Sequence, residues 1–375
     1  MAGIYLHIPF CRQACHYCNF HFSTSLARKN DFISALLKEI PLRKDYLEGE
    51  SVETVYLGGG TPSLLAAEEI ESILDALRSQ FPLAAGAEIT LEANPDDITV
   101  MRLGAWRQAG VNRLSIGVQS FFEEDLRWMN RAHSATQALD CIRQAREAGF
   151  DNLSIDLIYG GPTLPDARWQ QNVERAIGLG IPHLSCYALT VEPRTALDTL
   201  IRRHAMADVS PDDQARQFLL LMDWMAGAGY EHYEISNFAL PGHRSRHNSA
   251  YWQGKKYLGL GPSAHSYDGV SREWNIANNA RYIAEPGLIG EKEVLTVEQR
   301  LNEYIMIALR TVEGIDLRVM AERFGVQRAE EVRRRAEIYV RKGHLRLTGE
   351  RVHLTREGKL LADGIAADLF FEASS

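Results

Sequence analysis

Apolar residues in the first half of the chain follow two alternating patterns. Short runs of β-branched and other large apolar residues predict strands, and the longer stretches between them place apolar residues on one helical face. The predicted strands cover residues 3–8, 52–57, 88–92, 113–118, 153–158 and 184–189. The predicted helices cover residues 28–47, 67–80, 99–109, 135–148 and 168–179. Repeated strand–helix units of this length predict an α/β fold with a parallel sheet, closed or partly closed into a barrel.

Polar and glycine residues gather where these predicted strands end. The positions at or just beyond a strand's carboxyl end are Cys11, Gly58-Gly59-Gly60, Glu92, Gln119, Asp156 and Tyr187. Parallel barrels hold their active sites at that face. Carboxylate and amide groups at the ends of buried strands are costly unless they are paired. Six such positions in register therefore predict a single functional site.

The pattern changes near residue 290. Helices are predicted over residues 298–313, 317–324 and 330–342, followed by a hairpin that turns at Gly349-Glu350 and by a last helix. We therefore expect two domains, residues 1–290 and residues 291–375, of which the second resembles a winged helix. Residues 296–375 contain 14 Lys and Arg against 13 Asp and Glu. Because this balance is nearly neutral, we favour a packing or partner role over DNA binding.

Composition narrows the class of protein. The 375 residues are 45% hydrophobic and 24% charged, as in ordinary globular proteins, and the net charge of -8 does not favour nucleic acid or an anionic membrane. No apolar run approaches the length of a membrane span, and residues 1–10 lack the features of a signal peptide. Five cysteines, three of them clustered, do not form a disulfide framework, so we expect a cytoplasmic protein.

Three of these cysteines carry the strongest chemical signal. Cys11, Cys15 and Cys18 lie within eight residues, and thiolates are the preferred ligands of iron–sulfur clusters. Three sulfurs leave one iron of a four-iron cluster open to a ligand that is not cysteine. A zinc site or three unrelated thiols are the alternatives, but no second ligand pair with zinc spacing follows.

The glycine run Gly58-Gly59-Gly60 follows the second predicted strand directly. Because it carries no Cβ atoms, a ligand can approach the backbone closely, although a tight turn would use the same residues. Together with the cysteine loop, the run resembles the core of the radical S-adenosylmethionine (SAM) family. In that family the open iron is bound by the amino and carboxylate groups of SAM.

Further motifs narrow the resemblance. IYLHIPFC, the tyrosine before the last cysteine, GGGTPS, SIGVQSF, NRAH and DLIYG are similar to one branch. That branch contains the oxygen-independent coproporphyrinogen III dehydrogenases and their relatives, the HemW-type haem chaperones. The resemblance implies a [4Fe-4S] cluster on Cys11, Cys15 and Cys18. It implies that Tyr5, Tyr17, Gly59 and Glu92 surround the SAM on that cluster. Residues that contact a second SAM in the dehydrogenase match Gly60, Thr61, Gln119, Arg131 and Asp156. Whether one or two SAM molecules bind stays open.

Two departures separate the chain from the dehydrogenase. The dehydrogenase has a fourth cysteine two residues after the third, where this chain has Phe20, and it has a long segment before its cysteines, where this chain has ten residues. Both differences are typical of the chaperone group. The run from His247 to Trp252 matches the HNxxYW pattern of that group. His247 is therefore the expected haem ligand, with His243 and His265 as candidates for a second one.

We therefore expect a haem chaperone that binds haem and delivers it to an acceptor protein, with cluster and SAM as partners. The alternative is an enzyme that decarboxylates coproporphyrinogen III through a radical formed from SAM, so enzymatic activity and catalytic residues stay open. A winged-helix regulator that senses iron or haem is a third reading. An electron-donor protein is implied only if the cluster must be reduced, and a homodimer is a further expectation.

Overall fold

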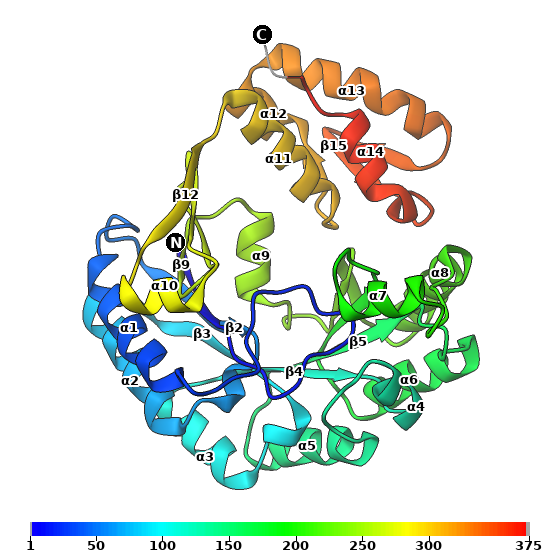
Figure 1. Ribbon diagram of the computed structural model, residues 1–375. Coiled ribbons are helices and arrows are strands. Elements are labelled where there is room, and N and C mark those ends of the chain that lie inside the picture. The colour runs from blue at the N-terminus through cyan, green and yellow to red at the C-terminus, as the bar shows by residue number, and fades with distance from the viewer. Residues whose placement is uncertain (1, 373–375) are drawn as a thin grey trace.

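The computed structural model describes residues 2–372. Six parallel strands lie side by side in chain order and form the curved wall at the centre of Figure 1. They are β1 (Ala2–Ile8), β2 (Val52–Gly59), β3 (Leu83–Ala93), β4 (Arg113–Gln119), β5 (Leu153–Tyr159) and β6 (His183–Ala188). The helices on their outer face are α1 (Lys29–Leu42), α2 (Ala67–Gln80), α3 (Val100–Ala109), α5 (Ala135–Glu147) and α6 (Asp166–Gly178). The prediction of a parallel, partly closed barrel is confirmed.

The two faces of the barrel wall differ in chemistry. On β1, the side chains of Ile4, Leu6 and Ile8 are fully buried and belong to the core between sheet and helices. Because successive strand residues point to opposite faces, Tyr5 and His7 point to the barrel interior. The interior is therefore lined with polar side chains, while the hydrophobic core lies outside the sheet.

The sheet continues beyond both ends of the barrel wall, to 12 strands in all. Beside β6 lie the antiparallel strands β8 (Asn237–Ala239) and β7 (Glu231–Glu234). Beside β1 lies the parallel strand β9 (Tyr257–Leu260), followed by the antiparallel strands β10 (His265–Tyr267), β11 (Ser271–Asn275) and β12 (Ile289–Val294). The sequence does not predict these strands, because they have at most six residues and β11 and β12 contain consecutive charged residues.

Other helices connect or cover these strands. They are α4 (Glu123–Trp128), α7 (Ala196–Arg202), α8 (Pro211–Gly227), α9 (Arg246–Trp252) and α10 (Asn279–Ala284), with single 3-10 turns at Pro62–Leu64, Pro95–Asp97 and Gly358–Leu361. Helix α1 ends at Leu42, five residues before its predicted end, because Pro41 occupies its last turn. No helix within residues 2–372 is long and apolar enough to cross a membrane.

The C-terminal domain has its own hydrophobic core. Its elements are α11 (Val297–Leu309), β13 (Ile315–Asp316), α12 (Leu317–Phe324), α13 (Val326–Arg341), β14 (Leu345–Thr348), β15 (Arg351–Leu354) and α14 (Ala362–Asp368). Strands β13, β15 and β14 form a small antiparallel sheet, as expected for a winged helix. The expected domain boundary at residues 290–291 falls inside β12, and the second core begins with α11.

A buried ion pair joins the two domains. The carboxylate of Glu234, 1% exposed, lies 3.0 Å from the guanidinium of Arg310, which follows α11. The backbone N–H of Ile235 donates to the carbonyl of Arg310, and that of Val312 donates to the carbonyl of Tyr233. The chain after α11 thus pairs with the edge of the large sheet. Backbone hydrogen bonds and the ion pair therefore both hold the two domains together.

The ion pair predicts a large effect of a single substitution. Replacing Arg310 by Leu leaves the Glu234 carboxylate buried without its cation, so we expect the free energy of unfolding to fall by about 2–4 kcal/mol. Arg356 pairs with Asp223 across the same interface, but both side chains are exposed. Arg356→Leu is therefore the control, with an expected loss below about 1 kcal/mol. Urea unfolding measures both, and equal losses would contradict the prediction.

Candidate functional site

The glycine run at the end of β2 is bonded to the cysteine loop. The N–H of Gly60 donates to the carbonyl of Ile8 at 2.9 Å, and the N–H of Thr61 donates to the carbonyl of Phe10 at 2.7 Å. A Cβ atom on Gly60 would lie 2.6 Å from the Phe10 oxygen, so the two backbones meet only because this residue is glycine. The contact brings the Thr61 hydroxyl to 3.5 Å from the sulfur of Cys11.

The cysteine loop carries three partly exposed free thiols, Cys11, Cys15 and Cys18. Burial raises the pKa of Cys11 to about 11, and the neighbouring Cys18 and Cys15 add to the rise. Arg131, from the NRAH motif, places Nη1 3.3 Å from the sulfur of Cys15. The Tyr17 hydroxyl lies beside the same sulfur. The three thiols thus share one turn next to a cation, and this soft donor set fits a cluster with one iron left for another ligand.

The thiol arrangement does not favour zinc. Within residues 2–372, no three His, Cys, Asp or Glu side chains converge closely enough to hold a single metal ion. A zinc ion requires its ligands around one point, whereas an iron–sulfur cluster takes one thiolate at each iron.

The carboxylates of Glu92 and Asp156 lie inside the barrel together with the buried guanidinium of Arg113. Glu92 accepts hydrogen bonds from the Tyr56 hydroxyl at 2.7 Å and from the Gly59 N–H at 3.2 Å. Burial raises the pKa of Glu92 to about 7 and that of Asp156 to about 6. The guanidinium of Arg113, 1% exposed, opposes both rises. The interior therefore tolerates carboxylates at a considerable electrostatic cost.

The site retains unused hydrogen-bonding capacity. Gln119, at the end of β4, has a φ of 66°, and its buried Oε1 has no partner among the described residues. The same holds for Nε of Arg131, although its Nη2 donates to Asn94 Oδ1 at 2.6 Å. A ligand that carries ammonium, carboxylate and hydroxyl groups would satisfy these atoms, and SAM carries all three. The residues present therefore fit SAM.

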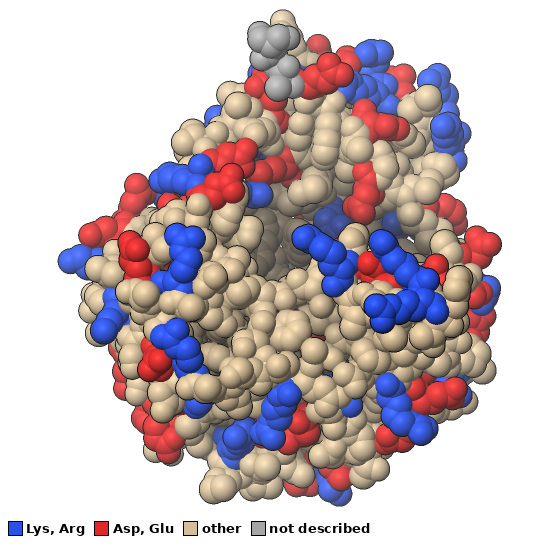
Figure 2. Space-filling view, viewed as in Figure 1, with Lys and Arg blue, Asp and Glu red and all other residues tan. Residues whose placement is uncertain are grey.

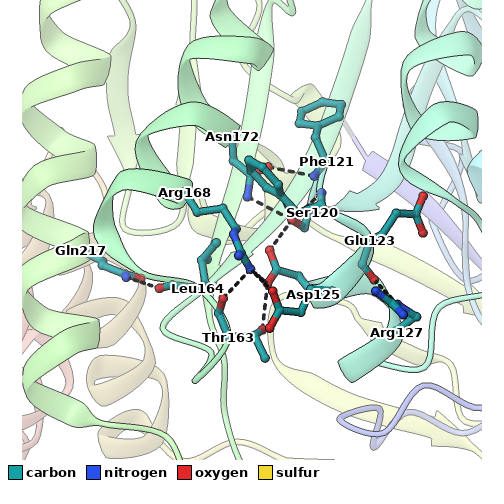
Figure 3. Close-up of polar contacts among 12 residues, drawn as sticks. Ser120, Phe121, Glu123, Asp125, Arg127, Thr163, Leu164, Arg168, Asn172 and Gln217 are labelled. Atoms are coloured by element: carbon teal, nitrogen blue, oxygen red, sulfur yellow. Dashed lines mark hydrogen bonds and ion pairs between the residues drawn. The ribbon is translucent and has the colours of Figure 1, made fainter.

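A buried polar network fixes the loop that follows Gln119 (Figure 3). The Ser120 hydroxyl donates to Asp125 at 2.7 Å, and Thr163 donates to the other oxygen of that carboxylate at 2.8 Å. Arg168 completes the contact at 3.3 Å, and Asn172 Oδ1 accepts the N–H of Phe121 at 2.8 Å. The network ties the loop after β4 to the loop after β5. The SIGVQSF motif therefore contains residues that hold Gln119 in place.

The sequence-predicted residues are linked through direct neighbours. Tyr5 stacks on Tyr56, the hydrogen-bond donor to Glu92, with ring centroids 6.1 Å apart. Asn94, which the sequence analysis missed, donates to Thr61 at 3.2 Å while accepting from Arg131. Arg113 was also missed, because a single arginine at the start of a predicted strand carries no motif. The Asn-Pro pair after β3 was the available signal for Asn94.

His247 lies inside the barrel next to Tyr56. It is 2% exposed, and its Nδ1 and Nε2 lie 2.8 Å and 2.9 Å from the hydroxyls of Thr54 and Tyr251. Burial lowers its pKa to about 3. Its ring stacks on that of Tyr56, the hydrogen-bond donor to Glu92, with centroids 5.0 Å apart. Both ring nitrogens contact hydroxyl groups, so binding of haem iron by His247 stays a prediction that requires one of these contacts to be released.

The two aromatic residues of the HNxxYW motif pack against neighbouring side chains. Tyr251 packs edge-on against His247 and Tyr257, with ring centroids 4.9 and 4.6 Å apart. The Arg310 guanidinium lies over the Trp252 ring, 5.5 Å from its centroid. The motif therefore joins the barrel interior to the C-terminal domain.

Comparison with known proteins agrees with this geometry. Residues 5–176 match the radical SAM superfamily, and residues 295–361 match the HemN C-terminal domain. The structure of coproporphyrinogen III oxidase (HemN) from Escherichia coli superposes with a TM-score of 0.85 over 98% of this chain and 90% of that one, at 24% identity. The barrel, the cysteine loop and the glycine run thus define a radical SAM protein, a family that implies a [4Fe-4S] cluster and SAM.

Two full-length relatives narrow the assignment. The heme chaperone HemW of Mycobacterium tuberculosis is 36% identical, covering 98% of this chain and 94% of the relative. That of Bacillus subtilis is 32% identical, covering 97% and 98%. The chain belongs to the HemW family.

The close contact at Gly60 predicts that assembly of the iron–sulfur cluster depends on this residue having no Cβ atom. Gly60→Ala forces the Cβ against the Phe10 carbonyl, and overpacking of this kind costs about 1–3 kcal/mol. We expect the cysteine loop to move and iron and sulfide contents to fall after anaerobic reconstitution. Gly161→Ala is the control, because its Cβ would meet only Leu189 at 3.7 Å. Wild-type iron content in Gly60→Ala would contradict the prediction.

The raised pKa of Glu92 predicts a pH-dependent stability of the cofactor-free protein. Between its ordinary pKa of 4.5 and the folded value of about 7, the unfolded chain releases the proton while the folded protein retains it. The free energy of unfolding therefore decreases as the pH rises through this window, by up to about 3 kcal/mol, and does not recover above it. We expect a smaller decrease in Glu92→Gln.

Denaturant unfolding at pH 5, 6, 7 and 8 measures this slope. Glu71→Gln, on the exposed side of α2, is the matched control and should keep the wild-type slope. An unchanged slope in Glu92→Gln would refute the assignment of this pH dependence to Glu92.

Proposed function

We propose that this chain binds haem and delivers it to an acceptor protein, and that it carries a [4Fe-4S] cluster with SAM at the open iron. The observation that carries the proposal is its similarity, over nearly the whole chain, to proteins named heme chaperone HemW. Cys11, Cys15 and Cys18 would hold the cluster. When bound, the cluster and SAM would supply a redox-active group beside the barrel mouth.

The SAM-binding residues belong to the same proposal. Tyr5, Tyr17, Gly59 and Glu92 would surround the SAM on the cluster. Gly60, Thr61, Gln119, Arg131 and Asp156 would contact a second SAM, if one binds. The unpartnered atoms of Gln119 and Arg131 support binding of a polar ligand at this end of the barrel.

Phe20 supports a chaperone over a coproporphyrinogen dehydrogenase. The dehydrogenase has a cysteine at this position, whereas Phe20 has no thiol and exposes 67% of its surface. An exposed aromatic residue next to the cluster loop suits contact with a flat apolar ligand or a protein partner. Figure 2 shows a hollow between the C-terminal domain and the barrel, with largely uncharged surface below it, through which such a ligand could approach.

The proposal also includes protein partners. They are an acceptor protein, an electron-donor protein if the cluster must be reduced, and a second copy of the chain in a homodimer. A cytoplasmic location is part of the same proposal, because free thiols persist in a reducing compartment.

A haem titration tests the proposal. We expect cluster-reconstituted protein under anaerobic conditions to bind haem saturably, with a shifted Soret band, and to lose it to an added haem-free acceptor. We expect no conversion of coproporphyrinogen III when SAM and a reductant are present. Product formation without haem binding would overturn the chaperone proposal in favour of the dehydrogenase.

A further inference from the structure

The barrel interior holds a buried guanidinium without a partner in the chain. Arg113, the first residue of β4, is 1% exposed, and its Nε and Nη1 have no hydrogen-bond partner among residues 2–372. A buried charge is costly unless an opposite charge and hydrogen bonds compensate it. The described residues supply no hydrogen bond at either nitrogen, so the structure points to a partner that does not belong to the chain.

The sheet register places this guanidinium one layer below the barrel mouth. Leu114 and Ile116 are fully buried in the core outside the sheet, so Arg113 faces the barrel interior. Its register partner on β3 is Thr90, which lies two residues before Glu92 in the direction of the mouth. Glu92 is partly exposed. Solvent from the mouth therefore reaches the layer directly above Arg113.

A hydroxyl and two amide oxygens in the same interior are also without partners among the described residues. The hydroxyl is that of Thr90, a fully buried residue beside Arg113. The amide oxygens are Oδ1 of Asn237 and Oε1 of Gln119, on residues that are 4% and 7% exposed. Through β6, Asn237 is in register with Asp156, and Gln119 ends β4. The unused donors thus gather around Arg113, and the unused acceptors lie nearer the mouth.

These groups define the chemistry of a ligand that would satisfy them. The guanidinium of Arg113 and the hydroxyl of Thr90 offer donors to a carboxylate. The carboxylates of Glu92 and Asp156, together with the two amide oxygens, offer acceptors to an ammonium group. Arg113 acts on both carboxylates through its charge, without a hydrogen bond. A ligand that carries a carboxylate and an ammonium close together would therefore pair all three charges.

An α-amino-acid head group has both charges on one carbon atom. A porphyrin propionate would pair with the guanidinium, but it would leave the unused acceptors unpaired and add a third carboxylate beside Glu92 and Asp156. The head group of an amino acid therefore fits the interior better than a propionate does.

We propose that Arg113 and Thr90 bind the carboxylate of an α-amino-acid head group inside the barrel, with its ammonium on the side of Glu92 and Asp156. This inference rests on the proposed SAM binding and adds two residues to it. A SAM on the cluster would use its amino and carboxylate groups at the open iron. The head group therefore belongs to a further SAM or to free methionine.

Anaerobic calorimetric titrations of cluster-reconstituted protein test the subsite with paired ligands. SAM is compared with decarboxylated SAM, and L-methionine with 3-(methylthio)propylamine, which also lacks the carboxylate. In the wild type we expect loss of the carboxylate to weaken binding by about tenfold or more. In Arg113→Met this penalty should shrink by about tenfold for the ligand that occupies the subsite, because the group that recognises the carboxylate is gone. The pair whose penalty shrinks identifies the source of the head group.

Three further variants separate recognition from folding. Thr90→Val should reduce the penalty less than Arg113→Met does, and Arg113→Lys should recover part of it, because lysine keeps the charge without the planar fork. Arg143→Met removes an exposed arginine of α5 and should keep the wild-type penalty. Because the guanidinium has no hydrogen-bond partner at Nε or Nη1 in the chain, ligand-free Arg113→Met should unfold at the same or a higher urea concentration than the wild type. A lower midpoint would show that Arg113 serves the fold, contrary to the proposal.

The outcomes distinguish this inference from the proposed function. If SAM binds but the carboxylate penalties of both pairs are unchanged in Arg113→Met, ordered water satisfies the guanidinium and the subsite is wrong, while SAM binding stands. If SAM does not bind but methionine binds through Arg113, the subsite stands and the proposed SAM binding fails. Weaker binding of iron protoporphyrin IX by Arg113→Met, with unchanged amino-acid binding, would assign the guanidinium to a propionate and overturn the proposal.

Discussion

The arrangement of the site depends on how closely β1 and β2 approach each other where they end. Their parallel pairing runs to Ile8 and Gly59, and two further backbone bonds carry it into the cysteine loop and the glycine run. Any side chain at Gly60 would separate them. Because the loop that carries the thiols leaves directly from β1, this contact sets the distance between the cluster ligands and the ends of the neighbouring strands.

The polar interior of the barrel follows from that same topology. The helices cover the outer face, so the apolar side chains of each strand face outward, and every second residue faces a narrow interior. Glu92 and Asp156 occupy such positions, and Arg113 near the opposite end supplies the compensating charge. Buried carboxylates are costly on their own and become favourable when a cationic group binds beside them. The raised pKa values are thus the electrostatic counterpart of a site built for a charged ligand.

The sequence predicts the helices and strands that have long, regular apolar patterns. It does not predict short strands or the direction in which a single side chain points. The six barrel strands and their helices have continuous apolar runs, and the predicted site residues at their ends are linked in space. The short strands β7 to β12 have few residues, and β11 and β12 are charged, so only their pairing with the barrel edge makes them strands. His247 shows the second limit, because the sequence does not give the direction in which its imidazole points. Only the fold reveals that α9 turns the ring inward against Thr54.

The HNxxYW motif then acquires a structural role. His247 closes one end of the barrel interior, Tyr251 bridges it to β9, and Trp252 lies beneath Arg310, which also binds the buried Glu234. One short helix thereby connects the interior of the barrel to the docking of the C-terminal domain. Besides any contact with haem, the motif thus fixes the position of the C-terminal domain.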